Sequence, residues 1–166
     1  MAMVEGMLQE LEQEAETTRR VLERVPDAQL QWRPHPKART LGELALHVAM
    51  VPGAVAQLAS TSPATAPRFG ADPAPSSTAE LIPALARSIQ QAKDVLGAMD
   101  DSKLTATWTL VDGDRELFAI PRIAFLRSVM LNHWYHHRGQ LSTYLRQLDV
   151  PVPSIYGPSA DENPFG

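Results

Sequence analysis

The sequence predicts an all-α fold, a four-helix bundle, built as a single domain over residues 1–166. Four long segments carry apolar residues at alternating spacings of three and four, the pattern of helices that each bury one face. No convincing strand–helix–strand pattern is present, which argues against a parallel sheet. With 166 residues, 44% of them hydrophobic, the chain is long enough to bury a core without additional cross-links.

The first predicted helix begins at Val4 and ends near Val25, because the next residue, Pro26, cannot continue it. Its apolar residues recur every three or four positions, which indicates packing along the whole length of the helix. They are Val4, Leu8, Leu11, Ala15, Thr18, Leu22 and Val25.

The second predicted helix follows a proline-containing linker. Thr40 and Glu43 have the spacing of a capping box, which marks the start of a helix. Pro52 is expected to kink this helix or to end its regular part. The apolar side consists of Leu41, Leu44, Val48, Val51, Val55 and Leu58.

Residues 59–77 are rich in Ala, Pro and Ser and carry almost no charge, so they predict a long, mobile loop without a functional motif. Ser77 and Glu80 form a second capping box, which marks the third predicted helix. Pro83 is expected to bend its first turns. The apolar side consists of Leu81, Leu85, Ile89, Ala92 and Leu96.

Residues 104–118 have a different pattern. The turn pair Asp112–Gly113 lies between β-branched and aromatic residues, which is compatible with a small extended hairpin before the last helix. Asp112, Asp114 and Glu116 could suggest calcium, but the remainder of an EF-hand loop is missing.

The last predicted helix opens near Pro121 and extends to about Leu148. His133 and His137 belong to its apolar stripe, and residues four apart on a helix have Cβ atoms ~5–6 Å apart. Two imidazoles at this spacing can converge on one metal ion at ~2.0–2.1 Å. The whole stripe is Leu126, Met130, His133, His137, Leu141, Tyr144 and Leu148.

A third metal ligand has to come from another helix. His47 lies on the apolar stripe of the second helix and is the candidate. His136 is rotated by about 100° from His137, and His35 lies in the linker, so both are weaker candidates.

The alternative is that each histidine is an ordinary core residue with its own hydrogen-bond partner. Three imidazoles in one small core are difficult to satisfy separately, because each unpaired buried polar group costs ~1–3 kcal/mol. A shared cation would satisfy all three at once, which favours a three-histidine metal site. Glu43, one turn before His47, could orient that ring, although its capping role explains it better. Gln140, one turn after His137, could line the site or simply be a polar flank of the helix.

Composition excludes several functional classes. The net charge is −4 and the basic residues are scattered, so no nucleic-acid partner is expected. The absence of cysteine excludes disulfides, zinc ribbons and a thiolate nucleophile from the protein itself.

The metalloprotease pattern H-E-x-x-H is absent, because Trp134 occupies the glutamate position. The N-terminal residues are acidic and amphipathic, so they are not expected to act as a signal peptide. No apolar run is expected to approach the ~20 residues of a membrane span, so a cytoplasmic protein without a membrane partner is expected.

Several motifs together resemble the DinB-like (DinB/YfiT) family. HWYHHRGQLSTYLRQL, at residues 133–148, looks like that family's last-helix signature H-x-x-x-H-R-G-Q, and LGELALHVA, at residues 41–49, resembles its second-helix motif. The QWRPHP stretch at 31–36 and the VPSIYGPSADE tail at 152–162 also fit. The resemblance implies up-down-down-up connectivity, frequent homodimers, and one divalent metal ion held by His47, His133 and His137.

The resemblance does not supply a substrate, since relatives include thiol S-transferases and thiol-dependent isomerases. The first hypothesis is an enzyme whose zinc or nickel ion activates a small-molecule substrate, a low-molecular-weight thiol, or water as nucleophile. Arg138 could hold an acidic cosubstrate, although its position off the stripe favours a surface or interface role. The alternatives are a metal-dependent hydrolase, a non-catalytic metal-stabilised bundle for stress response or binding, and an interaction module without metal.

Overall fold

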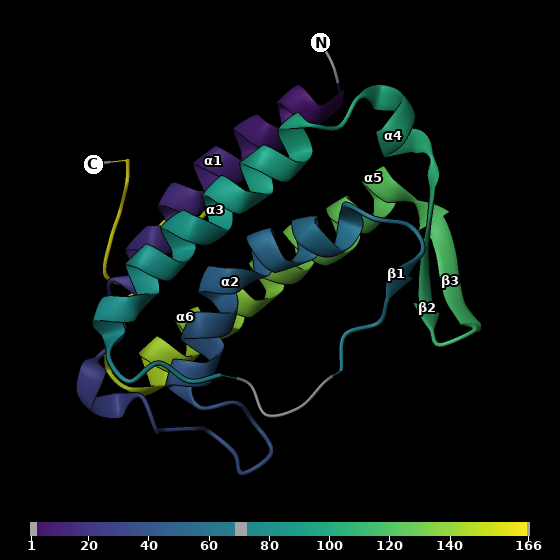
Figure 1. Ribbon diagram of the computed structural model, residues 1–166. Coiled ribbons are helices and arrows are strands. Elements are labelled where there is room, and N and C mark those ends of the chain that lie inside the picture. Colours follow the sequence, from purple (N-terminus) through teal and green to yellow (C-terminus); the bar gives the residue numbers. More distant parts are fainter. Residues whose placement is uncertain (1–2, 69–72, 166) are drawn as a thin grey trace.

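A computed structural model describes residues 3–68 and 73–165 of the chain. The fold is predominantly helical, with a small three-stranded sheet at one end (Figure 1). The helices are α1 (Met3–Leu22), α2 (Leu41–Ala59), α3 (Leu81–Gly97), α4 (Asp101–Thr105), α5 (Arg122–Phe125) and α6 (His133–Gln147). A π-helical segment, Leu126–Asn132, joins α5 to α6, and single 3₁₀ turns occur at Asp27–Gln29 and Thr78–Glu80.

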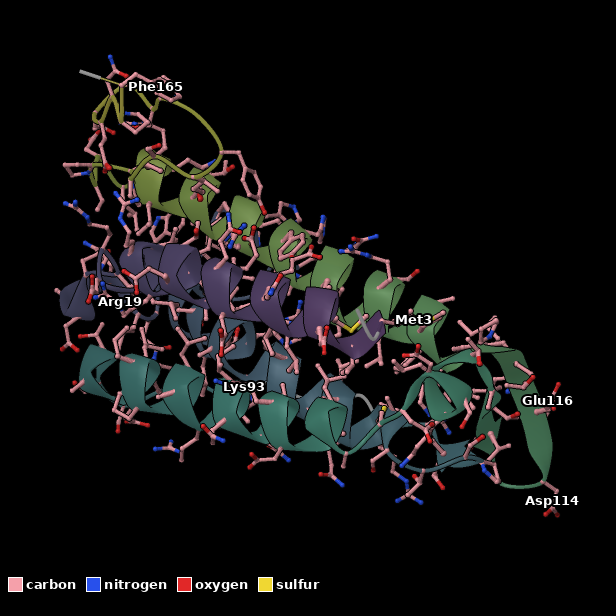
Figure 2. The ribbon with its side chains drawn as sticks, turned by 90° about the horizontal axis from the view of Figure 1, so that it is seen from above. Met3, Arg19, Lys93, Asp114, Glu116 and Phe165 are labelled. Atoms are coloured by element: carbon pink, nitrogen blue, oxygen red, sulfur yellow. The ribbon has the colours of Figure 1, made fainter. Side chains whose placement is uncertain are left out.

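The long helices pack side by side in pairs. α2 packs against α3 and against α6, while α1 packs against α3 and α6 (Figure 1). Seen from above, α1 lies between α3 and the C-terminal rod formed by residues 122–147 (Figure 2). α2 and α3 run in one direction, whereas α1 and the C-terminal rod run in the other. The apolar side chains of all four meet in one buried core.

α1 follows the predicted stripe, with Leu11, Thr18 and Leu22 buried. The helix itself ends at Leu22, earlier than the predicted end near Val25. Val25 is nevertheless buried and donates its backbone N–H to the Leu22 carbonyl, because the chain makes one more turn before Pro26.

Both predicted capping boxes are present. Thr40 Oγ1 accepts the Glu43 N–H at 3.1 Å, and Glu43 Oε2 accepts the Thr40 N–H at 2.6 Å. The box of Ser77 and Glu80 opens a 3₁₀ turn that leads directly into α3. Pro83 lies in the first turn of α3, where backbone N–H groups have no intrahelical acceptor. A proline at this position therefore breaks no hydrogen bond of the helix.

Pro52 does not end α2, which continues to Ala59. Proline leaves the carbonyl four residues earlier, that of Val48, without its intrahelical donor. Trp134 Nε1 takes over this role and donates to Val48 O at 2.8 Å. The Gly53 N–H donates to Ser88 Oγ of α3 at 2.8 Å, so neighbouring helices replace the hydrogen bonds that the interruption removes.

Gly53 also brings α2 close to α3. A Cβ atom at this position would lie 2.8 Å from the Ser88 carbonyl oxygen and 2.9 Å from Ser88 Cα. Only glycine therefore permits this approach of the two helices.

α2 corrects the expectation that no apolar run is as long as a membrane span. Among the described residues, it is long and apolar enough to qualify, but 61% of that window is buried inside the protein. Burial of this kind is the pattern of a core helix, which passes the same test of length and composition.

The sheet contains the expected hairpin and one unexpected strand. β2 (Thr107–Asp112) pairs antiparallel with β3 (Arg115–Pro121), and Gly113 adopts φ +58° in the turn. β1 (Ala64–Thr65) pairs parallel with β2 and belongs to the segment predicted to be a mobile loop. The prediction of a loop without regular structure is therefore wrong at Ala64–Thr65, because a two-residue strand has no periodicity and forms only through its partner. Residues 69–72 of the predicted loop lie outside the described residues.

The C-terminal rod is one continuous helical segment, but it is not regular. At its π-helical part, the His133 N–H donates to the carbonyl of Ser128, five residues earlier, and also to that of Met130. The prediction of a single α-helix from Pro121 to Leu148 is wrong here, since apolar spacing cannot distinguish one wider turn. π-helical turns occur frequently at functional sites. This one ends at Asn132, directly before His133, the first of the two candidate ligands on α6.

Candidate metal centre

The structure brings His47 of α2 together with His133 and His137 of α6. Their ring centroids lie 5.4 Å apart for His47–His133, 4.5 Å for His47–His137 and 4.4 Å for His133–His137. One nitrogen from each ring can be chosen so that all three lie within 4.8 Å of one another. The three residues selected by sequence spacing therefore form one cluster, which could hold a metal ion.

The two histidines of α6 face each other through their Nε2 atoms, which lie 2.7 Å apart. On the opposite edge of its ring, His137 Nδ1 lies 2.7 Å from Gln140 Oε1. His137 is buried and the other two rings are half-buried, so the cluster reaches from the core toward the surface.

The electrostatic state of the cluster suits a cation. Burial lowers the pKa of His137 to about 4; the hydrogen bond with Gln140 opposes this shift, and electrostatic interactions with His133 and Arg39 add to it. Burial also lowers the pKa of His133. Near neutral pH both rings are therefore uncharged, which is the form that binds metal.

The donor set fits a divalent ion of the zinc type. Three imidazole nitrogens are a common catalytic ligand set that leaves a coordination position for water or substrate. Two nitrogens on one tetrahedral ion would be roughly 3.3 Å apart, whereas the Nε2 atoms of His133 and His137 are 2.7 Å apart. Small rotations of the two rings would make up this difference.

The other sequence candidates lie outside the cluster. His136 is exposed, although its ring centroid lies 5.0 Å from that of His137. His35 is exposed in the linker, where its Nδ1 accepts the Lys37 N–H at 3.1 Å. Glu43 serves the capping box of α2, as the sequence favoured.

Arg138 corrects the expectation of a surface role. Its side chain is 1% exposed and pairs with Glu14 of α1, with Arg138 Nη1 2.6 Å from Glu14 Oε2. It also donates to Thr18 Oγ1 at 3.1 Å and to Tyr156 Oη at 2.5 Å. Arg138 therefore joins α6 to α1 and to the C-terminal tail.

Trp134 is a residue whose importance the sequence did not indicate beyond packing. It is fully buried, and its hydrogen bond to Val48 connects the neighbour of His133 to the neighbour of His47. The sequence feature that could have indicated this hydrogen bond is Pro52. Because proline has no N–H, the Val48 carbonyl lacks its intrahelical donor and can accept a hydrogen bond from another helix.

The described cavities do not coincide with the histidines. A cavity of about 850 Å³ lies between α2 and α3, with Met50, Arg87 and Gln91 in its wall. A second, of about 400 Å³, lies beside β1 and the end of α2. None of the three histidines lines either cavity, so neither identifies the position of a substrate.

The fold and site thus define a predominantly helical protein with a three-histidine cluster between two helices. A family model described as the DinB superfamily matches residues 10–141. The chain belongs to the DinB superfamily.

Solved structures agree with this assignment. A DinB-like protein from Bacillus cereus ATCC 10987 is 26% identical, with a TM-score of 0.68 over 92% of this chain and 97% of that one. The DinB-like protein YjoA from Bacillus subtilis is 14% identical, with a TM-score of 0.64 over 87% of this chain and 92% of that one, and shows similarity of fold alone.

A curated relative matches only a short segment. The uncharacterized protein YrdA of Bacillus subtilis (strain 168) is 46% identical over 33 residues, which are 20% of this chain. The match spans 20% of the length of that relative.

Proposed function

We propose that the protein is a metal-dependent enzyme that uses His47, His133 and His137 to hold a divalent ion, zinc or nickel. The reaction proposed is transfer of a low-molecular-weight thiol, or related chemistry with a metal-activated nucleophile. The observation that carries this proposal is the convergence of three imidazole nitrogens within 4.8 Å from two separate helices.

The properties of the cluster support a catalytic ion. Bound by three neutral imidazoles, a divalent ion keeps its full charge and lowers the pKa of a thiol or water molecule, which supplies a nucleophile at neutral pH. The charge of Arg39 acts on both His133 and His137, although burial is the larger influence on their pKa values. This additional positive charge favours an anion at the site.

The thiol has to come from a cosubstrate, because the chain contains no cysteine. His47 and His133 are half-buried rather than buried, which supports access of a small molecule to the cluster. The chain's own contribution is therefore to hold the ion, keep its ligands neutral and orient the incoming small molecule.

The test is a panel of low-molecular-weight thiols and electrophiles, assayed with the protein loaded with zinc, nickel or another first-row ion. We expect conjugate formation, detected by mass spectrometry, that requires both metal and thiol and is lost in His137→Ala. His35→Ala, which changes an exposed linker histidine, should keep full activity. Turnover that requires metal but no thiol would instead identify a hydrolase.

Chelation distinguishes an enzyme from a metal-stabilised scaffold. If the ion is catalytic, removing it should abolish turnover while the circular dichroism spectrum and melting temperature change little. Collapse of the fold on chelation, without turnover under any condition of the panel, would support the non-catalytic bundle for stress response or binding.

Two further features are part of the proposal. The opposed directions of α1 and the C-terminal rod relative to α2 and α3 support classification as an up-down-down-up four-helix bundle. The family resemblance supports a homodimer, which light scattering of the purified protein would test.

A further inference from the structure

The geometry points to Gln140 as a positioning residue of the metal centre, which fixes the tautomer and orientation of His137. This inference rests on the metal site proposed above and assigns a role to a residue outside the three-histidine cluster. The structural basis is the 2.7 Å contact between Gln140 Oε1 and His137 Nδ1.

The chemistry of the two groups determines the direction of the hydrogen bond. An amide oxygen can only accept, so with Gln140 Oε1 facing the ring the hydrogen lies on His137 Nδ1. A neutral imidazole carries one hydrogen, and the Nε2 atom of His137 therefore presents its lone pair. This Nε2 is the atom that faces His133 at 2.7 Å, inside the cluster.

The opposite tautomer would be unsuitable for a shared ion. With hydrogen on Nε2, His137 would direct an N–H into the space between the rings and leave only Nδ1, on the outer edge, as a ligand atom. In the contact seen in the structure, Gln140 Oε1 and the Nδ1 lone pair would then meet as two acceptors, and Gln140 could keep a hydrogen bond only by turning its amide so that Nε2 donates to Nδ1. The burial of His137 makes such a mismatch costly.

The position of Gln140 allows its role to be separated from folding. It lies on α6 one turn after His137, and its side chain is exposed. Its replacement at this exposed position should leave the apolar core intact. Gln147, exposed on the same face two turns further along α6, provides a matched control.

The first experiment compares the metal affinities of the wild type, Gln140→Leu, Gln140→Glu and Gln147→Leu by competition with a chelating dye. Loss of a hydrogen-bond partner of a metal-ligating histidine typically weakens binding about 10–100-fold. We expect a weakening in this range for Gln140→Leu, unchanged affinity for Gln147→Leu, and affinity at or above wild type for Gln140→Glu, which keeps the acceptor. Circular dichroism should show the same helix content in all four proteins.

The second experiment needs neither metal nor activity. Long-range ¹H–¹⁵N spectra of the metal-free protein distinguish the two imidazole tautomers. We expect His137 to carry its hydrogen on Nδ1 in the wild type and in Gln147→Leu, and to lose this preference in Gln140→Leu.

The outcomes separate this inference from the proposed function. A wild-type protein that takes up no metal would overturn the proposed site, and the spectra of the metal-free protein would still decide the role of Gln140. Metal binding that is equally tight in the wild type and Gln140→Leu, or hydrogen on Nε2 in the wild type, would overturn the role of Gln140 alone.

Discussion

Trp134 donates its indole Nε1–H to the backbone carbonyl of Val48 at 2.8 Å, and this hydrogen bond fixes α6 against α2 beside the histidine cluster. Each partner is the chain neighbour of a cluster histidine, Trp134 of His133 and Val48 of His47. The bond exists because Pro52 cannot donate to the same carbonyl. An interruption in one helix thus provides the attachment point for the other.

Replacing Trp134 by Phe should destabilise the protein and also weaken metal binding. The change leaves the Val48 carbonyl without its donor, which costs ~1–3 kcal/mol, and frees the two helices to shift. Urea unfolding and metal competition would measure the two effects. Trp108→Phe is the control, because Trp108 is equally buried and donates to Thr61 O at 2.8 Å, beyond the C-terminal end of α2 and far from the histidine cluster. It should lose stability but bind metal normally, and an equal loss of affinity in both variants would contradict the role given to Trp134.

Single replacements of the cluster histidines should abolish stoichiometric metal binding. His47→Ala and His137→Ala each leave two ligands, too few for a tight site. Elemental analysis after reconstitution should find a metal-to-protein ratio near one for the wild type and for His35→Ala, and near zero for the two variants. A metal-to-protein ratio near zero for the wild type, after metal has been added back, would contradict every metal-based function proposed for this chain.

Gly53→Ala should destabilise the protein, whereas Gly139→Ala should stabilise it. The added methyl at Gly53 would lie 2.8 Å from the Ser88 carbonyl oxygen of α3, and overpacking of this kind costs ~1–3 kcal/mol. At Gly139, on exposed α6 surface, an added Cβ meets nothing within 4 Å, so alanine should add ~0.5–1 kcal/mol through helix propensity. Thermal and urea unfolding would measure both, and equal effects of the two substitutions would show that α2 and α3 do not depend on the close approach.

Arg138→Met should be one of the most destabilising changes outside the apolar core. It leaves Glu14, whose side chain is 9% exposed, as a buried carboxylate without its cation, which costs about 3–5 kcal/mol. Arg127→Met should cost under ~1 kcal/mol, because the Arg127–Glu10 pair is solvent-exposed, at 50% and 30%. The double variant Glu14→Met/Arg138→Met should recover much of the loss in urea unfolding. No recovery would show that the arginine acts through its contacts with Thr18 and Tyr156 rather than through the charge of Glu14.

The C-terminal tail should contribute stability that disappears in acid. The hydrogen bond from Arg146, assisted by the Val152 N–H, holds the pKa of Asp161 below its usual 3.8. A carboxyl with a lowered pKa stabilises the fold above its unfolded pKa and loses this contribution as pH falls through its folded pKa. Asp161→Asn should therefore be less stable than the wild type near neutral pH, and the difference should shrink below about pH 4. Urea unfolding over this pH range would measure it, and a constant difference would rule out the ion pair as the cause.

The sequence by itself determined the four long helical segments and the three candidate histidines. Apolar spacing located the stripes of the long helices, and local hydrogen-bonding rules located the two capping boxes. Both signals depend on residues three or four positions apart, so they are complete within a single segment of chain. The spacing of His133 and His137 made them neighbours before any fold was known, and His47 followed because it lies on a second buried stripe.

Only the tertiary structure decided the features that need two distant segments. β1 forms because Ala64 and Thr65 meet β2, and the burial of Arg138 depends on Glu14, more than a hundred residues away along the chain. The continuity of α2 through Pro52 likewise depends on donors and acceptors from α3 and α6. The meeting of His47 with the other two histidines belongs to this group as well. The distance between the helices is set by packing contacts, such as that of Gly53 with α3 and that of Trp134 with Val48. The spacing of residues within one helix does not determine these contacts.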